Sequence, residues 1–186
     1  MIYNNLREIR ESIEAVRGEI YAFTEPLSPE QAAFRRSPES WSVAELLEHI
    51  CKTEEFLGVR ISALVDQAEV SQGRAPAGFT PGRISIEEAA KQAEGKRFVS
   101  PESVRPTAVP LAESLDRLRA SRARLLADWP RFEALDLTGV AFPHPVFGPL
   151  NIYQWLAFFT VHEDRHLEQM RAVISAEGFP GRRDEG

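Results

Sequence analysis

The apolar residues of this chain recur with the period of an α-helix over four long stretches, and no segment alternates over several residues as a strand does. In the first stretch the apolar residues return every three or four positions: Leu6, Ile9, Ile13, Val16, Ile20 and Phe23. One face of a helix repeats at that spacing. The pattern predicts helices over about residues 3–24, 42–69, 108–128 and 150–177, with a short helical turn near residues 29–33. Four long helices with two long connections favour an all-α four-helix bundle that is not a simple up-down-up-down one.

Proline and glycine residues separate the helices and fill two connectors. Ser42, followed three residues later by Glu45, has the spacing of a capping box at the start of the second helix. We expect a long irregular crossover over about residues 70–106, with one short helix near residues 85–94. Residues 129–148 form a second irregular connector. Long connectors inside compact domains are usually functional lids or interface segments.

Length and charge restrict the classes of protein to consider. The 186 residues predict one domain spanning residues 1–186. The formal net charge of −6 disfavours nucleic acid and, more weakly, an anionic membrane surface as partners. Cys51 is the single cysteine, so an intramolecular disulfide is excluded. The N-terminal segment lacks a signal-peptide profile, and no run approaches the ~18 apolar residues of a membrane helix, so we expect a cytoplasmic protein.

The last predicted helix carries the most informative string, TVHEDRHLEQM. His162 and His166 are four residues apart, so they lie one helical turn apart on one face. That face also carries Phe159, Met170 and Val173, so both imidazoles are expected to point into the bundle. A single inward histidine is more simply a hydrogen-bonded core residue, but a stacked pair presents ring nitrogens to one point. The pair therefore predicts a site for a divalent metal ion, with Zn²⁺ or Ni²⁺ as the expected ion.

A third ligand is expected from elsewhere in the chain, and two histidines remain. His49 lies at the flank of the apolar stripe of the second helix, in phase with Leu46, and can point into the bundle. His144 lies between two prolines, where a turn or surface position is the simpler interpretation. Cys51 lies on nearly the opposite side of the helix from His49, so we do not expect it to be a ligand. Three histidines leave one position open, as catalytic zinc sites do and closed structural sites do not.

The segment HEDRH also matches the H-E-x-x-H string of zinc metalloproteases, in which Glu163 would be the general base. The residues that follow disfavour a protease, because Gln169 and Ala172 stand where the longer form of that motif has glycine and histidine. Glu163 stays a candidate base for another metal-dependent hydrolase. Its helix phase turns it partly away from the histidine pair, so a buried carboxylate in a polar network is the simpler interpretation.

Other side chains are candidates for supporting or substrate-binding roles. Glu54 falls on the apolar stripe of the second helix, where it could orient an imidazole or pair with an arginine across the bundle. Arg165 lies at the flank of the last helix and could bind an anionic substrate group, although a solvated position is simpler. Tyr153 and Trp155 are most simply core residues, and could alternatively line the pocket.

Three segments together carry a resemblance to a known family: PLSPEQAAFRRSPESWSV, WSVAELLEHI and HPVFGPLNIYQWLAFFTVHEDRHLEQM. Over its whole length the chain resembles the DinB-like superfamily, including its YfiT and bacillithiol S-transferase branch. The resemblance implies an up-down-down-up four-helix bundle, often a homodimer, with a metal ion held by His49, His162 and His166. The insert over residues 70–106 is less typical of the family.

The resemblance also implies, for some members, transfer of a low-molecular-weight thiol such as bacillithiol or mycothiol to an electrophile. A metal ion that binds a thiol lowers its pKa, so a thiolate forms near neutral pH. Two alternatives stay open at this stage: a metal-dependent hydrolase with Glu163 as base, and a non-catalytic metal-binding or dimerisation protein. We expect a small-molecule substrate in the two enzymatic cases.

Overall fold

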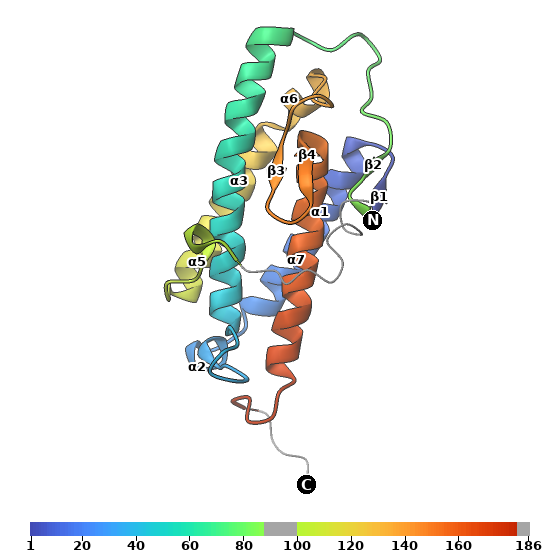
Figure 1. Cartoon of the computed structure of the whole chain (residues 1–186). Coiled ribbons are helices and arrows are strands. Elements are labelled where there is room, and N and C mark those ends of the chain that lie inside the picture. The colour runs from blue at the N-terminus through green and yellow to red at the C-terminus, as the bar shows by residue number, and fades with distance from the viewer. Residues whose placement is uncertain (88–99, 182–186) are drawn as a thin grey trace.

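Four long helices form the body of the protein, which a computed structural model describes over residues 1–87 and 100–181. They are α1 (Leu6–Thr24), α3 (Val43–Gln72), α5 (Leu111–Ala127) and α7 (Ile152–Ile174). Figure 1 shows α1 and α7 running in one direction and α3 and α5 in the other. Helix α3 packs against both α5 and α7, and α1 packs against α7. The predicted all-α four-helix bundle is confirmed, with the up-down-down-up order of helices.

The ends of the long helices follow local capping signals. Asn5 caps α1 with its side chain, so this helix begins three residues later than predicted. The capping box predicted for Ser42 and Glu45 is present at the start of α3. Asn151 and Gln154 form a second capping box at the start of α7. Among the described residues, no helix combines the length and apolar character needed to cross a lipid bilayer.

Short elements fill the connectors, and two pairs of strands correct the expectation that the chain has none. The helical elements are α2 (Pro29–Ala33), the 3-10 helix η1 (Glu102–Val104) and α6 (Trp129–Ala134). The strands are β1 (Ile2–Tyr3), β2 (Ile84–Ser85), β3 (Ala141–His144) and β4 (Gly148–Asn151), paired antiparallel as β1–β2 and β3–β4. Strands of two to four residues are too short to show an alternating pattern. Ser85 begins the predicted helix over residues 85–94 but lies in β2, and residues 88–94 of that helix lie outside the described residues.

Two apolar clusters fill the bundle, one toward each end. Along each long helix, a buried charged residue stands where one cluster gives way to the other. These residues are Arg17 on α1, Glu54 on α3, Arg122 on α5 and Glu163 on α7. The β3–β4 hairpin lies against the first half of α7 (Figure 1). Polar groups therefore concentrate in the middle of the bundle, where the candidate site lies.

Candidate metal centre

The three histidines predicted from the sequence meet between α3 and α7, and we call them the histidine cluster: His49, His162 and His166. His162 Nε2 lies 3.2 Å from Nε2 of His49 and 3.2 Å from Nε2 of His166. The three candidate ligand atoms all lie within 4.8 Å of one another. His49 and His166 are buried, and His162 is half-buried. Because α3 carries one histidine and α7 carries two that are one turn apart, packing of these helices assembles the cluster.

Hydrogen bonds on the outer side of two rings determine which nitrogen faces the cluster. His49 Nδ1 donates to the carbonyl oxygen of Val104 at 2.8 Å. His166 Nδ1 donates to the amide oxygen of Gln169 at 2.7 Å. A neutral imidazole carries one proton, so a donor at Nδ1 leaves a lone pair at Nε2. Both Nε2 atoms are therefore acceptors, and both face His162.

His162 cannot satisfy both of its neighbours. Its neutral ring has at most one proton at Nε2, and one N–H cannot fully satisfy two acceptors. If the proton is on Nδ1 instead, three lone pairs face one another. Buried acceptors in proteins are normally paired with a donor or a cation, so this arrangement favours binding of a cation. A divalent metal ion bound by the three nitrogens would satisfy all of them, and Zn²⁺ and Ni²⁺ both accept such a set.

The separation of the nitrogens also fits a metal ion. Ligands at the usual zinc–nitrogen distance of about 2.0–2.1 Å in a tetrahedral arrangement lie about 3.3 Å apart. The two Nε2–Nε2 separations at His162 are 3.2 Å. Three protein ligands leave at least one position for water or substrate.

Burial keeps the three imidazoles uncharged. It lowers the pKa of His166 to about 3 and also lowers the pKa of His49. The pKa of His162 lies well below its usual value, chiefly through burial. The positive charge of Arg165 adds to the lowering at all three rings. Because metals bind the neutral imidazole, the cluster is in its metal-binding form at neutral pH.

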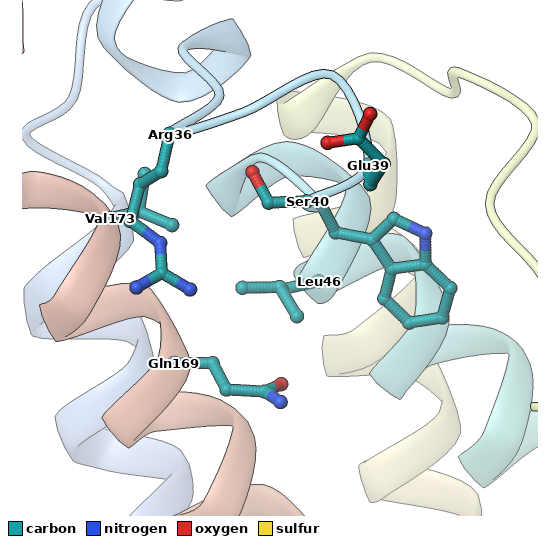
Figure 2. A pocket seen from close by; sticks show the side chains of 7 residues that line it. Arg36, Glu39, Ser40, Leu46, Gln169 and Val173 are labelled. Atoms are coloured by element: carbon teal, nitrogen blue, oxygen red, sulfur yellow. The ribbon is translucent and has the colours of Figure 1, made fainter. Parts of the chain in front are cut away.

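A cavity of about 240 Å³ lies beside the histidine cluster, between the second half of α7, the start of α3 and the loop that precedes α3. Two of its lining residues contact the cluster. Gln169 binds His166, and the Trp41 ring lies 5.1 Å from the ring of His49. In Figure 2 the Arg36 side chain extends from the loop toward Gln169, whose amide points into the same space from α7. Within the described residues Arg36 forms no ion pair, but Glu39 also lines the cavity, so the lining carries one cation and one anion. The cavity has room for part of a small molecule.

Glu54 and Glu163 form an ionic cluster with Arg17 and Arg122 and not with the histidines. Arg17 binds Glu163 through Nη2 at 2.6 Å and through Nε at 3.1 Å. Arg122 Nη2 binds the same carboxylate at 2.6 Å. Both oxygens of Glu163 are thus held by guanidinium groups, which argues against its predicted role as general base. Glu54 pairs with arginines across the bundle, the second of its two predicted roles, and does not orient an imidazole.

Tyr153 and Trp155 are core residues, and the alternative that they line the pocket is not supported. The buried Tyr153 hydroxyl donates to Leu135 O at 2.7 Å and accepts from the N–H of Leu137 at 3.1 Å. Trp155 Nε1 donates to a carbonyl of β3 at 3.2 Å. Arg165 is exposed on α7, close enough to the histidine cluster to affect its pKa values.

His144 and Cys51 lie outside the histidine cluster, as expected. His144 Nδ1 accepts the backbone N–H groups of Val146 and Phe147, both at 3.1 Å, and so organises the turn between β3 and β4. Its ring stacks on that of Phe147, and burial lowers its pKa to about 4. Cys51 is buried, and burial raises the pKa of its thiol to about 12. Neither side chain is offered to a metal ion in the cluster.

Sequence reasoning missed the groups that hold the histidines. Gln169 follows His166 by three residues, a spacing that places it on the same helix face, so its role had a local signal. The carbonyl of Val104 reaches His49 from the long crossover, and a backbone carbonyl has no signature in the sequence. Arg17 and Arg122 interrupt apolar stripes in the same way as Glu54, and they could have been found as its partners.

Comparisons with known proteins agree with this fold. A family model described as the DinB superfamily matches residues 12–170, a range that includes all three histidines. The chain is 28% identical over 149 residues to the uncharacterized protein YuaE of Bacillus subtilis (strain 168), covering 79% of this chain and 85% of that protein. The crystal structure of TT2238, a four-helix bundle protein, matches with a TM-score of 0.59 at 22% identity, covering 89% of this chain and 96% of that chain. At this identity, the likeness to TT2238 shows a shared fold alone.

Proposed function

This chain belongs to the DinB superfamily, and on that premise we propose that its histidine cluster holds one divalent metal ion and transfers a low-molecular-weight thiol to an electrophilic small molecule. The observation that carries the proposal is the convergence of three Nε2 atoms that the chain cannot satisfy by itself. A metal ion with an open position stabilises a thiolate at neutral pH, which is the nucleophilic form of a thiol. We expect Zn²⁺ or Ni²⁺.

The state of the nearby side chains favours thiol transfer over hydrolysis. Cys51 is a buried thiol whose pKa is raised to about 12, so it is a poor nucleophile. A thiol co-substrate makes a protein nucleophile unnecessary. A metal ion would also activate water, but Glu163, the base that the sequence suggests for hydrolysis, is bound to Arg17 and Arg122. The hydrolase alternative therefore lacks the group assigned to it.

Two cationic side chains near the cluster, Arg36 and Arg165, support a co-substrate that carries an anionic group, although the carboxylate of Glu39 also lines the cavity at Arg36. Arg36 points into the cavity that Gln169 and Trp41 share with the histidines. Arg165 is exposed on α7 beside the cluster. An anion bound by either guanidinium would hold the co-substrate next to the open metal position. The Arg36→Gln variant is expected to raise KM for an anionic thiol several-fold, with a smaller effect on KM for an uncharged thiol.

Purified protein tests the proposal in two steps. Metal analysis is expected to find about one Zn²⁺ or Ni²⁺ per chain, and His162→Ala is expected to lose it. Thiol consumption is then measured with epoxide and chlorinated electrophiles, beside ester and amide hydrolysis. His162→Ala should abolish thiol transfer, and His144→Asn, which removes a histidine outside the cluster, should retain it. Hydrolysis without thiol consumption, or metal binding without either activity, would overturn the transferase assignment.

A further inference from the structure

The end of the long crossover is fastened to α3 beside His49, and we call residues 101–109 the strap. Glu48 is 1% exposed and precedes His49 in the sequence. Its Oε1 accepts the backbone N–H of Thr107 at 2.7 Å and the Thr107 hydroxyl at 2.8 Å. Its Oε2 accepts the backbone N–H of Val109 at 3.0 Å. One buried carboxylate therefore binds three donors of the strap.

The strap is shaped to receive this carboxylate. Ala108, between the two N–H donors, has φ of +66°, the only positive φ of a non-glycine residue among the described residues. A left-handed residue between two others turns successive N–H groups toward one point and forms a small anion-binding concavity. Residues with a Cβ adopt this conformation rarely, so the bonds to Glu48 hold Ala108 there.

Lys52, one turn after Glu48 on α3, strengthens the attachment. Its Nζ donates to the carbonyl of Arg105 at 2.8 Å and to the hydroxyl of Thr107 at 2.9 Å, and lies 2.7 Å from Glu48 Oε1. The Thr107 hydroxyl thus accepts from Lys52 and donates to Glu48. Two neighbouring side chains of α3 hold the strap in one position along the helix.

The strap in turn holds His49. The carbonyl that accepts the proton of His49 Nδ1 belongs to Val104, three residues before Thr107. This bond keeps the proton on Nδ1 and leaves the lone pair of Nε2 facing the cluster. Outer partners of this kind orient metal-binding imidazoles and affect metal affinity.

We propose that Glu48 is a positioning residue that, through the strap, sets the tautomer and direction of His49, so that docking of the strap and metal affinity are coupled. The inference rests on the proposed metal site and goes beyond it, because it gives the strap a regulatory role. Coupling of this kind is reciprocal. Bound metal stabilises the docked strap, and any partner that displaces the strap from α3 lowers the affinity for the metal.

Zn²⁺ affinity, measured by competition with a chelator, tests the proposal on the wild type and three variants. Glu48→Gln keeps the size of the side chain but turns N–H groups toward a strap donor, and we expect about 10- to 100-fold weaker binding. Lys52→Met should weaken binding less, about several-fold. Glu55→Gln, the matched control on the same helix, removes a carboxylate that pairs with Arg117 and should bind as the wild type does.

Two further measurements separate positioning from a general loss of structure. The ¹⁵N shifts of the His49 ring in metal-free protein should show the Nδ1–H tautomer in the wild type and a mixture in Glu48→Gln. Zn²⁺ should slow exchange of the Thr107 and Val109 amides in the wild type. If circular dichroism shows that the Glu48→Gln protein is unfolded, the Lys52→Met variant supplies the same comparison. Wild-type protein that binds no Zn²⁺ would overturn the metal site and this coupling together. Zn²⁺ bound with equal affinity by the wild type and the folded strap variants would overturn the coupling alone.

Discussion

Two buried polar clusters occupy the middle of the bundle, and they differ in whether the chain satisfies them. In the ionic cluster both glutamates bind both arginines, and the two positive and two negative charges cancel. The remaining arginine donors reach the carbonyls of Leu118 and Ile13. In the histidine cluster three Nε2 atoms face one another without enough protons between them. His162 and Glu163 are neighbours in the sequence, yet His162 belongs to the unsatisfied histidine cluster and Glu163 to the satisfied ionic cluster.

The difference indicates two separate tasks. Burial alone would lower the pKa of Arg17 and raise that of Glu54, but their opposite charges outweigh burial and keep both groups charged. Charged groups from all four long helices are satisfied in one alignment of those helices, so the ionic cluster should fix their register. The imidazoles stay neutral and unsatisfied, which suits a ligand that arrives from outside. Breaking each cluster should therefore have different consequences.

The largest expected effect is the loss of one arginine from the ionic cluster. Arg122→Met leaves Glu54 and Glu163 buried with one cation between them, because Arg17 alone remains. Breaking a buried ion pair from one side costs about 3–5 kcal/mol, so we expect the unfolding free energy of metal-free protein to fall by about that amount. Urea denaturation followed by circular dichroism measures it.

The matching change in the histidine cluster, His162→Ala, sharpens the comparison. In metal-free protein His162→Ala removes a ring whose acceptor neighbours were already unsatisfied, so we expect a loss of about 1 kcal/mol, the typical effect of a substitution. If this variant loses as much unfolding free energy as Arg122→Met, the histidine cluster is a structural network of its own, and the contrast between the clusters is wrong.

Metal ions should stabilise the folded protein through the histidine cluster. A ligand that binds only the folded state adds about 2.7 kcal/mol at a free concentration 100 times its Kd. We expect a gain of this order for the wild type with Zn²⁺, reversed by a chelator. His166→Ala should show little gain, whereas Arg122→Met, if folded, should show the same gain as the wild type. A gain that survives the loss of His166 would place the metal elsewhere.

Glu163→Gln tests whether neighbouring residues can belong to independent clusters. The amide keeps the shape of the side chain but loses the charge that binds Arg17 and Arg122. Hydrogen bonds to charged groups contribute about 1.5–3 kcal/mol, so the unfolding free energy should fall by about that amount. Zn²⁺ affinity should change less than about three-fold, and any thiol-transfer activity should persist because Glu163 is not its base. Loss of metal binding in a folded Glu163→Gln protein would show that the two clusters are not independent.

The sequence predicted the long helices and the histidine cluster for the same physical reason. Helical periodicity relates residues within a few positions of each other, so the pairing of His162 with His166 is visible in one segment. His49 was selected by its phase on another helix. The ionic cluster had a comparable signal that was only partly used. One charged residue interrupts the apolar stripe of each long helix, and two of these four residues are positive and two are negative. Only Glu54 was recognised as a partner for an arginine across the bundle.

The remaining features depend on contacts between distant or very short segments. β1 and β2 pair two residues each, from Ile2–Tyr3 and Ile84–Ser85, too few to show a period. The strap binds Glu48 and His49 through backbone N–H and carbonyl groups, which every residue carries. The turn at His144 depends on a ring nitrogen that accepts two backbone N–H groups. Composition and periodicity describe side chains, so they cannot predict sites that the backbone builds.

The last expected effect concerns acid, and it separates buried imidazoles from paired carboxylates by pH. Burial lowers the pKa of His144 from its usual 6.5 to about 4. Between these values the unfolded chain binds this proton and the folded chain does not, so the unfolding free energy falls as the pH drops. For Glu54, Arg17 and Arg122 outweigh burial and lower the pKa from 4.5. Its contribution is complete above that value and is lost only as the pH falls further.

Replacing His144 by asparagine should therefore flatten the acid response in the upper pH window alone. The asparagine side-chain oxygen can accept the same two backbone N–H groups, while the titrating ring is gone. In metal-free protein the histidine cluster titrates in both proteins. The charge of His144 is the smallest of the causes that lower the pKa of His162, so the titration of the cluster largely cancels in their difference. Urea denaturation at about pH 7 gives the structural cost of the substitution, and that cost should shrink as the pH approaches about 4. A difference that stays constant over this range would show that the folded protein accepts a proton on His144 as readily as the unfolded chain does.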